Sequence, residues 1–115
     1  MWLASPLAAL ELPSGQAIAF QEYLVEPQDA QDQLARFRYV MAALEGMVYA
    51  EVEADFLTLC EAHALPLLRD HGVVAGQIIV SIGARVSEFG VTDPDNRQFF
   101  EVFRPEGDSC IWEGF

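Results

Sequence analysis

The 115-residue sequence contains few basic residues: six Lys and Arg stand against 18 Asp and Glu, which gives a formal net charge of −12. Such a chain is repelled by the phosphates of DNA and RNA and by anionic membrane surfaces, so neither is an expected ligand. A basic protein or a cation is attracted instead, although acidic charge also keeps an apolar protein soluble. No stretch of the sequence reaches the about 18 apolar residues that a membrane-spanning helix requires. The expected partners are therefore a protein or a second copy of the chain.

Recognisable catalytic motifs are also missing from the sequence. Ser81 and Ser87 lie in no GxSxG context. The acidic segment 93–96 lacks the Gly and Glu that a calcium-binding EF-hand loop has at its sixth and twelfth positions. Glu51 and Asp55, one helical turn apart, are more typical of a solvated helix face than of an acid–base pair. We therefore expect no cofactor, and we favour a non-enzymatic protein over an enzyme.

The length and the hydrophobic content of 52% predict one domain with a single buried core. We assign residues 12–115 to this domain. Residues 1–11 form a moderately apolar N-terminal segment, with small residues near Ala8 and Ala9 that suit a signal-peptide cleavage site. The segment has no Lys or Arg before its apolar part, so we interpret it only as a possible remnant of a signal peptide.

Hydrophobic periodicity predicts an α+β fold. The expected strands cover residues 17–25, 34–44, 77–82 and 98–103, with a short edge strand at 85–89 and a final strand after a turn at 104–107. Residues 51–68 have the apolar spacing of a helix, and Pro66 is expected to end its regular part near Ala64. The prediction is an antiparallel sheet of four to five strands, with one main helix packed on one face and a C-terminal β-hairpin.

The two cysteines, Cys60 and Cys110, are predicted to form a disulfide. Cys60 lies on or beside the apolar face of the helix, and Cys110 begins the last strand on the same face as Trp112. If that face meets the helix, the bond closes a loop of about 50 residues and stabilises the domain by about 4 kcal/mol. Two buried free thiols are an alternative, and a zinc site that includes His63 and His71 is a less favoured one. A disulfide indicates a periplasmic or otherwise exported protein, whereas reduced cysteines indicate a cytoplasmic one.

The C-terminal hairpin has apolar residues on both faces, and only one face can meet the helix. We predict that Ile111 and Phe115, with either Phe99 or Phe100, contribute to a contact surface for a partner. The favoured function is thus protein–protein contact by a small exported domain. The alternative is a ligand-binding or enzymatic pocket between helix and sheet, formed by His63 and a nearby carboxylate. A solvent-open pocket at His63 favours that alternative, and a His63 sealed under Phe56 and Trp112 favours the contact domain.

Several segments, taken together, resemble a known family. They are LPSGQ at 12–16, RFR at 36–38, LCE at 59–61, ALP at 64–66, QIIVS at 77–81, FG at 89–90, QFFEVFR at 98–104 and CIWEGF at 110–115. The set resembles a small proteobacterial family of exported proteins classed as a domain of unknown function, over about residues 11–115. The resemblance implies export but brings no active site. Members are sometimes labelled acetolactate synthase, and the sequence does not support that label because no Gly-rich phosphate loop follows a strand.

Overall fold

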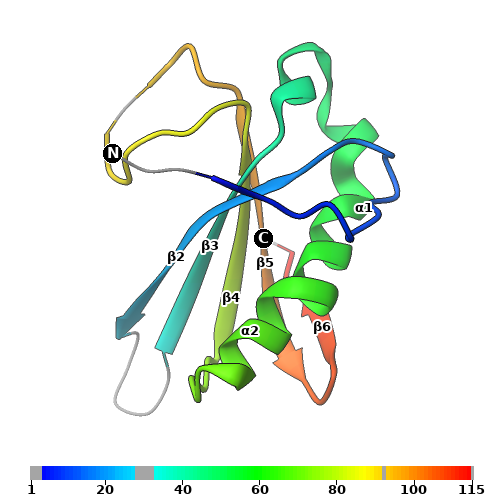
Figure 1. The fold of residues 1–115 in the computed structure, drawn as a ribbon. Helices are drawn as coiled ribbons and strands as arrows, with labels where there is room; N and C mark the ends of the chain where they lie inside the picture. The colour runs from blue at the N-terminus through cyan, green and yellow to red at the C-terminus, as the bar shows by residue number, and fades with distance from the viewer. Residues whose placement is uncertain (1–3, 28–32, 92, 115) are drawn as a thin grey trace.

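The computed structural model describes residues 4–27, 33–91 and 93–114. Six strands form one sheet in chain order: β1 (Ser5–Pro6), β2 (Ala19–Pro27), β3 (Gln33–Val40), β4 (Gln77–Gly83), β5 (Gln98–Glu106) and β6 (Ser109–Trp112). The helical elements η1 (Ala42–Gly46), α1 (Tyr49–Leu59), η2 (Cys60–Ala64) and α2 (Leu65–Asp70) connect β3 to β4. Figure 1 shows α1 and α2 on one face of the sheet. The predicted α+β class with one main helix is confirmed.

The sheet differs from the prediction in strand number and direction. It is mixed, because β3 and β4 pair in parallel while the other neighbouring strands pair antiparallel. The helix between β3 and β4 returns the chain to the end where β3 began, and the next strand therefore runs in the same direction. Strand β1 was not predicted, because its two residues are too few for a periodic signal. The predicted edge strand at 85–89 is wrong, because this segment is a loop. The buried Asn96 anchors the loop, since its Oδ1 atom accepts hydrogen bonds from the amides of Ala84 and Arg85.

The main helix continues through Pro66, so its predicted end near Ala64 is wrong. Residues Cys60–Ala64 form one turn of π-helix, in which the Leu65 amide donates to the Cys60 carbonyl five residues earlier. Proline has no N–H to donate, and the wider turn just before it changes the hydrogen-bonding pattern where the helix would otherwise break. The α-helix then resumes and ends at Asp70.

The core lies between the inner face of the sheet and the helix. The sheet contributes Phe37, Tyr39, Ile78, Val80, Ile82 and Phe103, and the helix contributes Val52, Phe56, Leu59, Cys60 and Leu68. These residues alternate along the strands and recur every three to four positions in the helix, which is the pattern that buries one face of each element. No helix of the described part of the chain covers the opposite, outer face of the sheet (Figure 1).

Residues 7–18 pack on the end of this core. Leu12 and Ile18 are buried, and the Leu7 amide donates to the Ile18 carbonyl at 3.0 Å. The Ser14 amide donates to Oδ1 of the buried Asp55 in α1 at 2.9 Å. Within residues 4–27, 33–91 and 93–114, no helix combines the length and apolarity needed to cross a membrane.

Candidate functional site: the groove between α1 and the C-terminal hairpin

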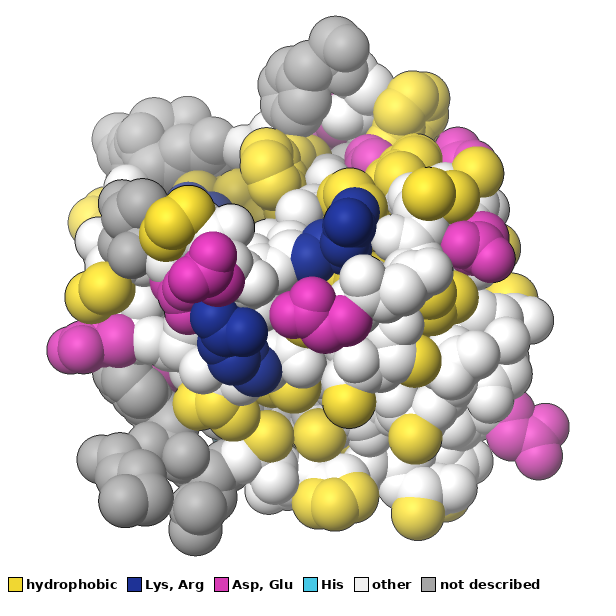
Figure 2. Space-filling view, turned by 90° about the horizontal axis from the view of Figure 1, so that it is seen from above, with side chains coloured by type: hydrophobic (Ala, Val, Ile, Leu, Met, Phe, Trp, Pro, Cys, Tyr) yellow, Lys and Arg dark blue, Asp and Glu magenta, His cyan; other side chains and the backbone are white. Residues whose placement is uncertain are grey.

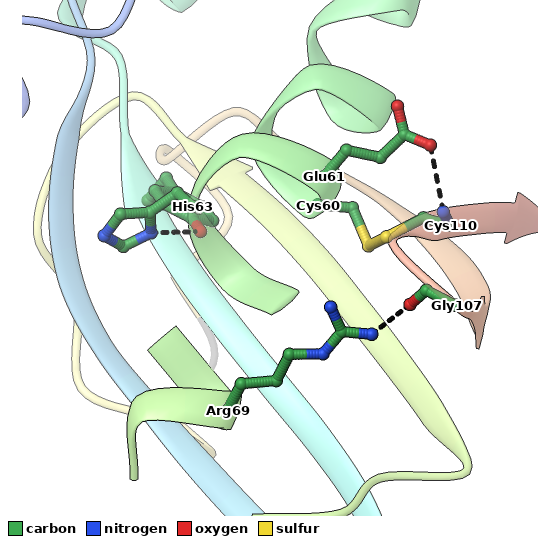
Figure 3. The surroundings of a disulfide bond; sticks show 7 residues. Cys60, Glu61, His63, Arg69, Gly107 and Cys110 are labelled. Atoms are coloured by element: carbon green, nitrogen blue, oxygen red, sulfur yellow. Dashed lines mark hydrogen bonds between the residues drawn. A yellow bond between two sulfur atoms is a disulfide. The ribbon is translucent and has the colours of Figure 1, made fainter. Parts of the chain in front are cut away.

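The C-terminal hairpin is joined to the helix by the predicted disulfide. Cys60 and Cys110 are bonded, with their Cα atoms 6.3 Å apart and a separation of 50 positions in the sequence. Cys60 lies on the helix and Cys110 on the hairpin (Figure 3). Cys60 is the first residue of the π-helical turn, and both cysteines are buried. The bond therefore fixes the last strand of the sheet to the middle of the helix.

Polar contacts beside the disulfide hold the same two elements together. The Cys110 amide donates to Oε2 of Glu61 at 3.0 Å, and Arg69 donates to the Gly107 carbonyl and forms an ion pair with Asp108. Figure 3 shows Glu61 and Arg69 reaching from the helix to the hairpin, while His63 points away from it. Because β6 is the edge strand, the bond to Glu61 also occupies an amide that would otherwise be open to another chain.

A groove of about 430 Å³ lies between α1 and strands β5 and β6. Its lining consists of Tyr49, Ala50, Glu53, Ala54 and Leu57 from α1, and Glu101, Phe103, Cys110 and Trp112 from the hairpin. Ala50, Ala54 and Leu57 form an exposed apolar stripe at i, i+4 and i+7 on the helix. The groove thus combines apolar walls with two carboxylates and exposed aromatic surface.

The Glu101 side chain is held in a fixed position inside the groove. The Tyr49 hydroxyl donates to its Oε1 atom, and the Trp112 indole N–H donates to its Oε2 atom. Desolvation raises the pKa of Tyr49 well above its usual value, and the bond to Glu101 and the charges of Glu101 and Glu53 raise it further. Tyr49 therefore stays protonated and remains a donor to Glu101 at all physiological pH values. Trp112 remains 62% exposed, so its ring is accessible from solvent.

The structure divides the predicted contact residues between two faces. Phe100 and Ile111 lie on the outer face and are 64% and 38% exposed. Phe99 lies on the inner face with its ring centroid 5.6 Å from that of Tyr49, and Phe115 lies outside the described residues. Tyr49 and Glu101 were not predicted as site residues. The available signal was an acidic residue at the inward position between Phe99 and Phe103.

His63 lies at a separate hollow of about 280 Å³, lined otherwise by Leu7, Ala9, Leu10 and Ala62. Its Nδ1 atom is 2.8 Å from the Tyr39 hydroxyl, and burial lowers its pKa. It is half-buried and faces β2 and β3, so it is not sealed under Phe56 and Trp112 as one prediction required. The hollow is open, but no carboxylate lines it among the described residues, and the hypothesis of a catalytic or ligand-binding pocket there stays a prediction.

The residues considered for a zinc site have other partners. Cys60 and Cys110 bond to each other, and Nδ1 of His71 is 2.6 Å from the Tyr23 hydroxyl. In the part of the chain that the structure describes, no three His, Cys, Asp or Glu side chains are grouped as metal ligands. These residues therefore do not form the zinc cluster considered from the sequence.

Most arginines of the described chain are paired with acids away from the groove. Arg38 pairs with Glu22 at 2.5 Å on the outer face, and its guanidinium carbon is 5.5 Å from the centre of the Phe89 ring. Arg85 pairs with Asp93 at 3.1 Å and with Glu45 at 3.7 Å. Figure 2 shows basic side chains lying beside acidic ones at one end of the molecule.

Fold and site together define a disulfide-bonded α+β domain with an acidic, aromatic groove beside its C-terminal hairpin. The chain belongs to the family described as "Family of unknown function (DUF6497)", whose model matches residues 2–115. The match confirms the resemblance to a family of unknown function. Comparison with curated proteins gives no match, and comparison with solved structures gives none either.

Proposed function

We propose that this protein is an exported, non-enzymatic domain that binds a basic protein partner along the edge formed by β6. The observation that carries the proposal is the exposure of Trp112 on the groove side and of Phe100 on the outer side of a hairpin that the disulfide fixes to the helix. Exposed aromatic side chains on a rigid element supply large contact area at a low cost in conformational entropy.

Export is supported by the disulfide. Such bonds persist in oxidising compartments and are rare in the cytosol, where thiols are kept reduced. Cys60 and Cys110 are both buried in the core cluster, so the bond is part of the packed structure. A location in the cell envelope or outside the cell therefore suits the chain better than the cytosol.

The acidity of this edge favours a basic partner over a second copy of the chain. Glu53 and Glu101 lie in the groove, Glu61 binds the edge of β6, and Glu113 directly follows that strand. A second copy would bring the same acidic edge and a charge of −12, and the two surfaces would repel each other. A partner with lysine or arginine beside apolar residues complements both the acidic and the aromatic side chains of the edge.

Site-specific crosslinking in the native cell tests the proposal. A photoreactive phenylalanine analogue is placed at Phe100 or at Trp112, and the matched control places it at Val74, which is 83% exposed and lies between α2 and β4. We expect one protein to crosslink from both hairpin positions and not from Val74. The same purified protein should bind the wild type, and Trp112→Ala should weaken that binding at least tenfold, as expected of an interface tryptophan.

Three results would count against the proposal. They are crosslinking of the same protein from Val74, a crosslinked product with the mass of two copies of this chain, and unchanged affinity of the purified partner for Trp112→Ala.

A further inference from the structure

The acidic side chains of the groove lie apart from the ion pairs of the described chain. The ion pairs in the described part of the chain join Arg36 to Glu26, Arg38 to Glu22, Arg69 to Asp108, Arg85 to Glu45 and Asp93, and Arg104 to Glu106. Across these same described residues, no arginine pairs with Glu53 or Glu101. The full sequence contains no lysine, so a lysine ammonium in the groove has to come from another molecule.

Aromatic surface lies beside these carboxylates. The exposed Trp112 ring lines the groove together with Tyr49 and Phe103. The face of an aromatic ring attracts a cation electrostatically, and tryptophan does so most strongly. Because the indole N–H is bonded to Glu101, the orientation of the ring is tied to the position of the carboxylate.

The shape and bonding of the groove favour an ammonium over a guanidinium. The apolar stripe of Ala50, Ala54 and Leu57 provides a surface for the four methylenes of a lysine stem. Each oxygen of Glu101 already accepts one hydrogen bond, which leaves less room for the bidentate fork of an arginine. An ammonium is a compact point charge that needs only one acceptor on each neighbouring carboxylate.

We infer that the groove is the binding subsite for a lysine side chain of the partner, with the ammonium between Glu53 and Glu101 and against the Trp112 ring. This inference rests on the proposed function, since it names the residue of the partner that the groove receives. Glu101 is a binding residue, whereas Tyr49 is a positioning residue that holds the Glu101 carboxylate.

Titration with small lysine analogues tests the subsite without any knowledge of the partner. The probe is N-acetyl-lysine methylamide, observed through the Trp112 indole N–H signal in a ¹H–¹⁵N spectrum. Controls are the norleucine analogue, which keeps the stem and lacks the amine, and the arginine analogue. We expect a saturable shift that is at least about fivefold tighter for lysine than for norleucine, as one charge-assisted contact provides.

Two groove variants and one matched control separate a binding role from a structural one. Glu101→Gln should weaken lysine binding about fivefold or more, and Glu53→Gln should weaken it without removing the bonds of Tyr49 and Trp112 to Glu101. Glu88→Gln removes an exposed acid outside the groove and should leave binding unchanged. If Glu101→Gln fails to fold, Glu53→Gln alone still tests the subsite.

The subsite and the proposed function fail in different ways. A lysine analogue that binds no better than norleucine, or that binds Glu53→Gln as well as the wild type, overturns the subsite. Tighter binding of the arginine analogue also overturns it. None of these three results affects partner crosslinking at Phe100 and Trp112. In the partner complex, a carbodiimide should form an amide between Glu53 or Glu101 and a partner lysine, and crosslinks only at other carboxylates would contradict the inference.

Discussion

Replacement of both cysteines by alanine should lower the free energy of unfolding by about 4 kcal/mol. The disulfide closes a loop whose ends are 50 residues apart. In the chain-entropy model this loop restricts the unfolded chain by about 14 cal/mol/K, which corresponds to about 4 kcal/mol at room temperature. Small domains have a total stability of about 5–15 kcal/mol, so a large part of the stability would be lost.

Urea unfolding of the oxidised wild type, the reduced wild type and the Cys60→Ala, Cys110→Ala double variant measures this contribution. The reduced wild type keeps both sulfur atoms in the core. Its free energy of unfolding, compared with that of the oxidised wild type, measures the contribution of loop closure. The same quantity compared with the double variant measures the packing that is lost with the sulfur atoms. The hairpin should open before the rest of the sheet in the reduced protein, because only polar contacts such as Glu61 to Cys110 then hold it to the helix. Oxidised and reduced proteins that differ by less than about 1 kcal/mol would refute the reasoning.

Three further predictions concern single residues. Asp55→Ala should cost about 1–3 kcal/mol, measured by urea unfolding, because it leaves the Ser14 amide without its acceptor, whereas Asp55→Asn keeps an acceptor oxygen and should cost less. Burial lowers the pKa of His63, so the unfolded chain binds a proton at this side chain more readily than the folded chain does. The free energy of unfolding should therefore fall as the pH drops below about 6.5. This part of the pH dependence should be absent in His63→Gln. An equal pH dependence in the two proteins would contradict that account. Gly107→Ala should lower the free energy of unfolding by about 1 kcal/mol, because the φ of 60° at this position favours glycine. Gly46→Ala, at a position without a positive φ, should lower it less, and thermal unfolding of both variants measures the difference.

Local patterns in the sequence were sufficient to predict the core elements and the disulfide. The apolar spacing placed Cys60 on or beside the buried face of a helix, and strand alternation placed Cys110 on the same strand face as Trp112. The bond followed if that strand face meets the helix, with free thiols or a zinc site as alternatives, and the structure confirms the bond. The hairpin itself was predicted correctly, but its turn lies at Gly107 and Asp108 and shares only Gly107 with the expected segment 104–107.

Features that depend on distant contacts were not predictable in the same way. The groove needs Tyr49 and Glu101, which are 52 residues apart and meet only because the helix packs across β5. The parallel pairing of β3 with β4 depends on the path of the helix between them, which periodicity does not report. The π-helical turn is a change in backbone hydrogen bonding just before Pro66 that lets the helix continue. The sequence shows only the proline, which by itself predicts a helix end.

Site geometry also changed the interpretation of the aromatic residues. Phe99, Phe100 and Ile111 looked alike in the sequence, but strand alternation and register place Phe99 against Tyr49 and the other two on the outer face. Trp112 was expected to cover the helix, yet it lies at the rim of the groove because β6 is the edge of the sheet. Trp112 is therefore exposed because β6 lies at the edge of the sheet, and the sequence alone does not predict which strand lies there.

The most direct test of a disulfide-fixed hairpin in an exported domain is the oxidation state of the cysteines in the native cell. Cells that produce the protein are treated with an alkylating agent before lysis, and the intact mass is measured with and without a reductant. The account predicts that Cys60 and Cys110 are both protected and react only after reduction, in protein recovered from an oxidising compartment. Two freely alkylated cysteines in folded protein would contradict both the bond and the proposed export.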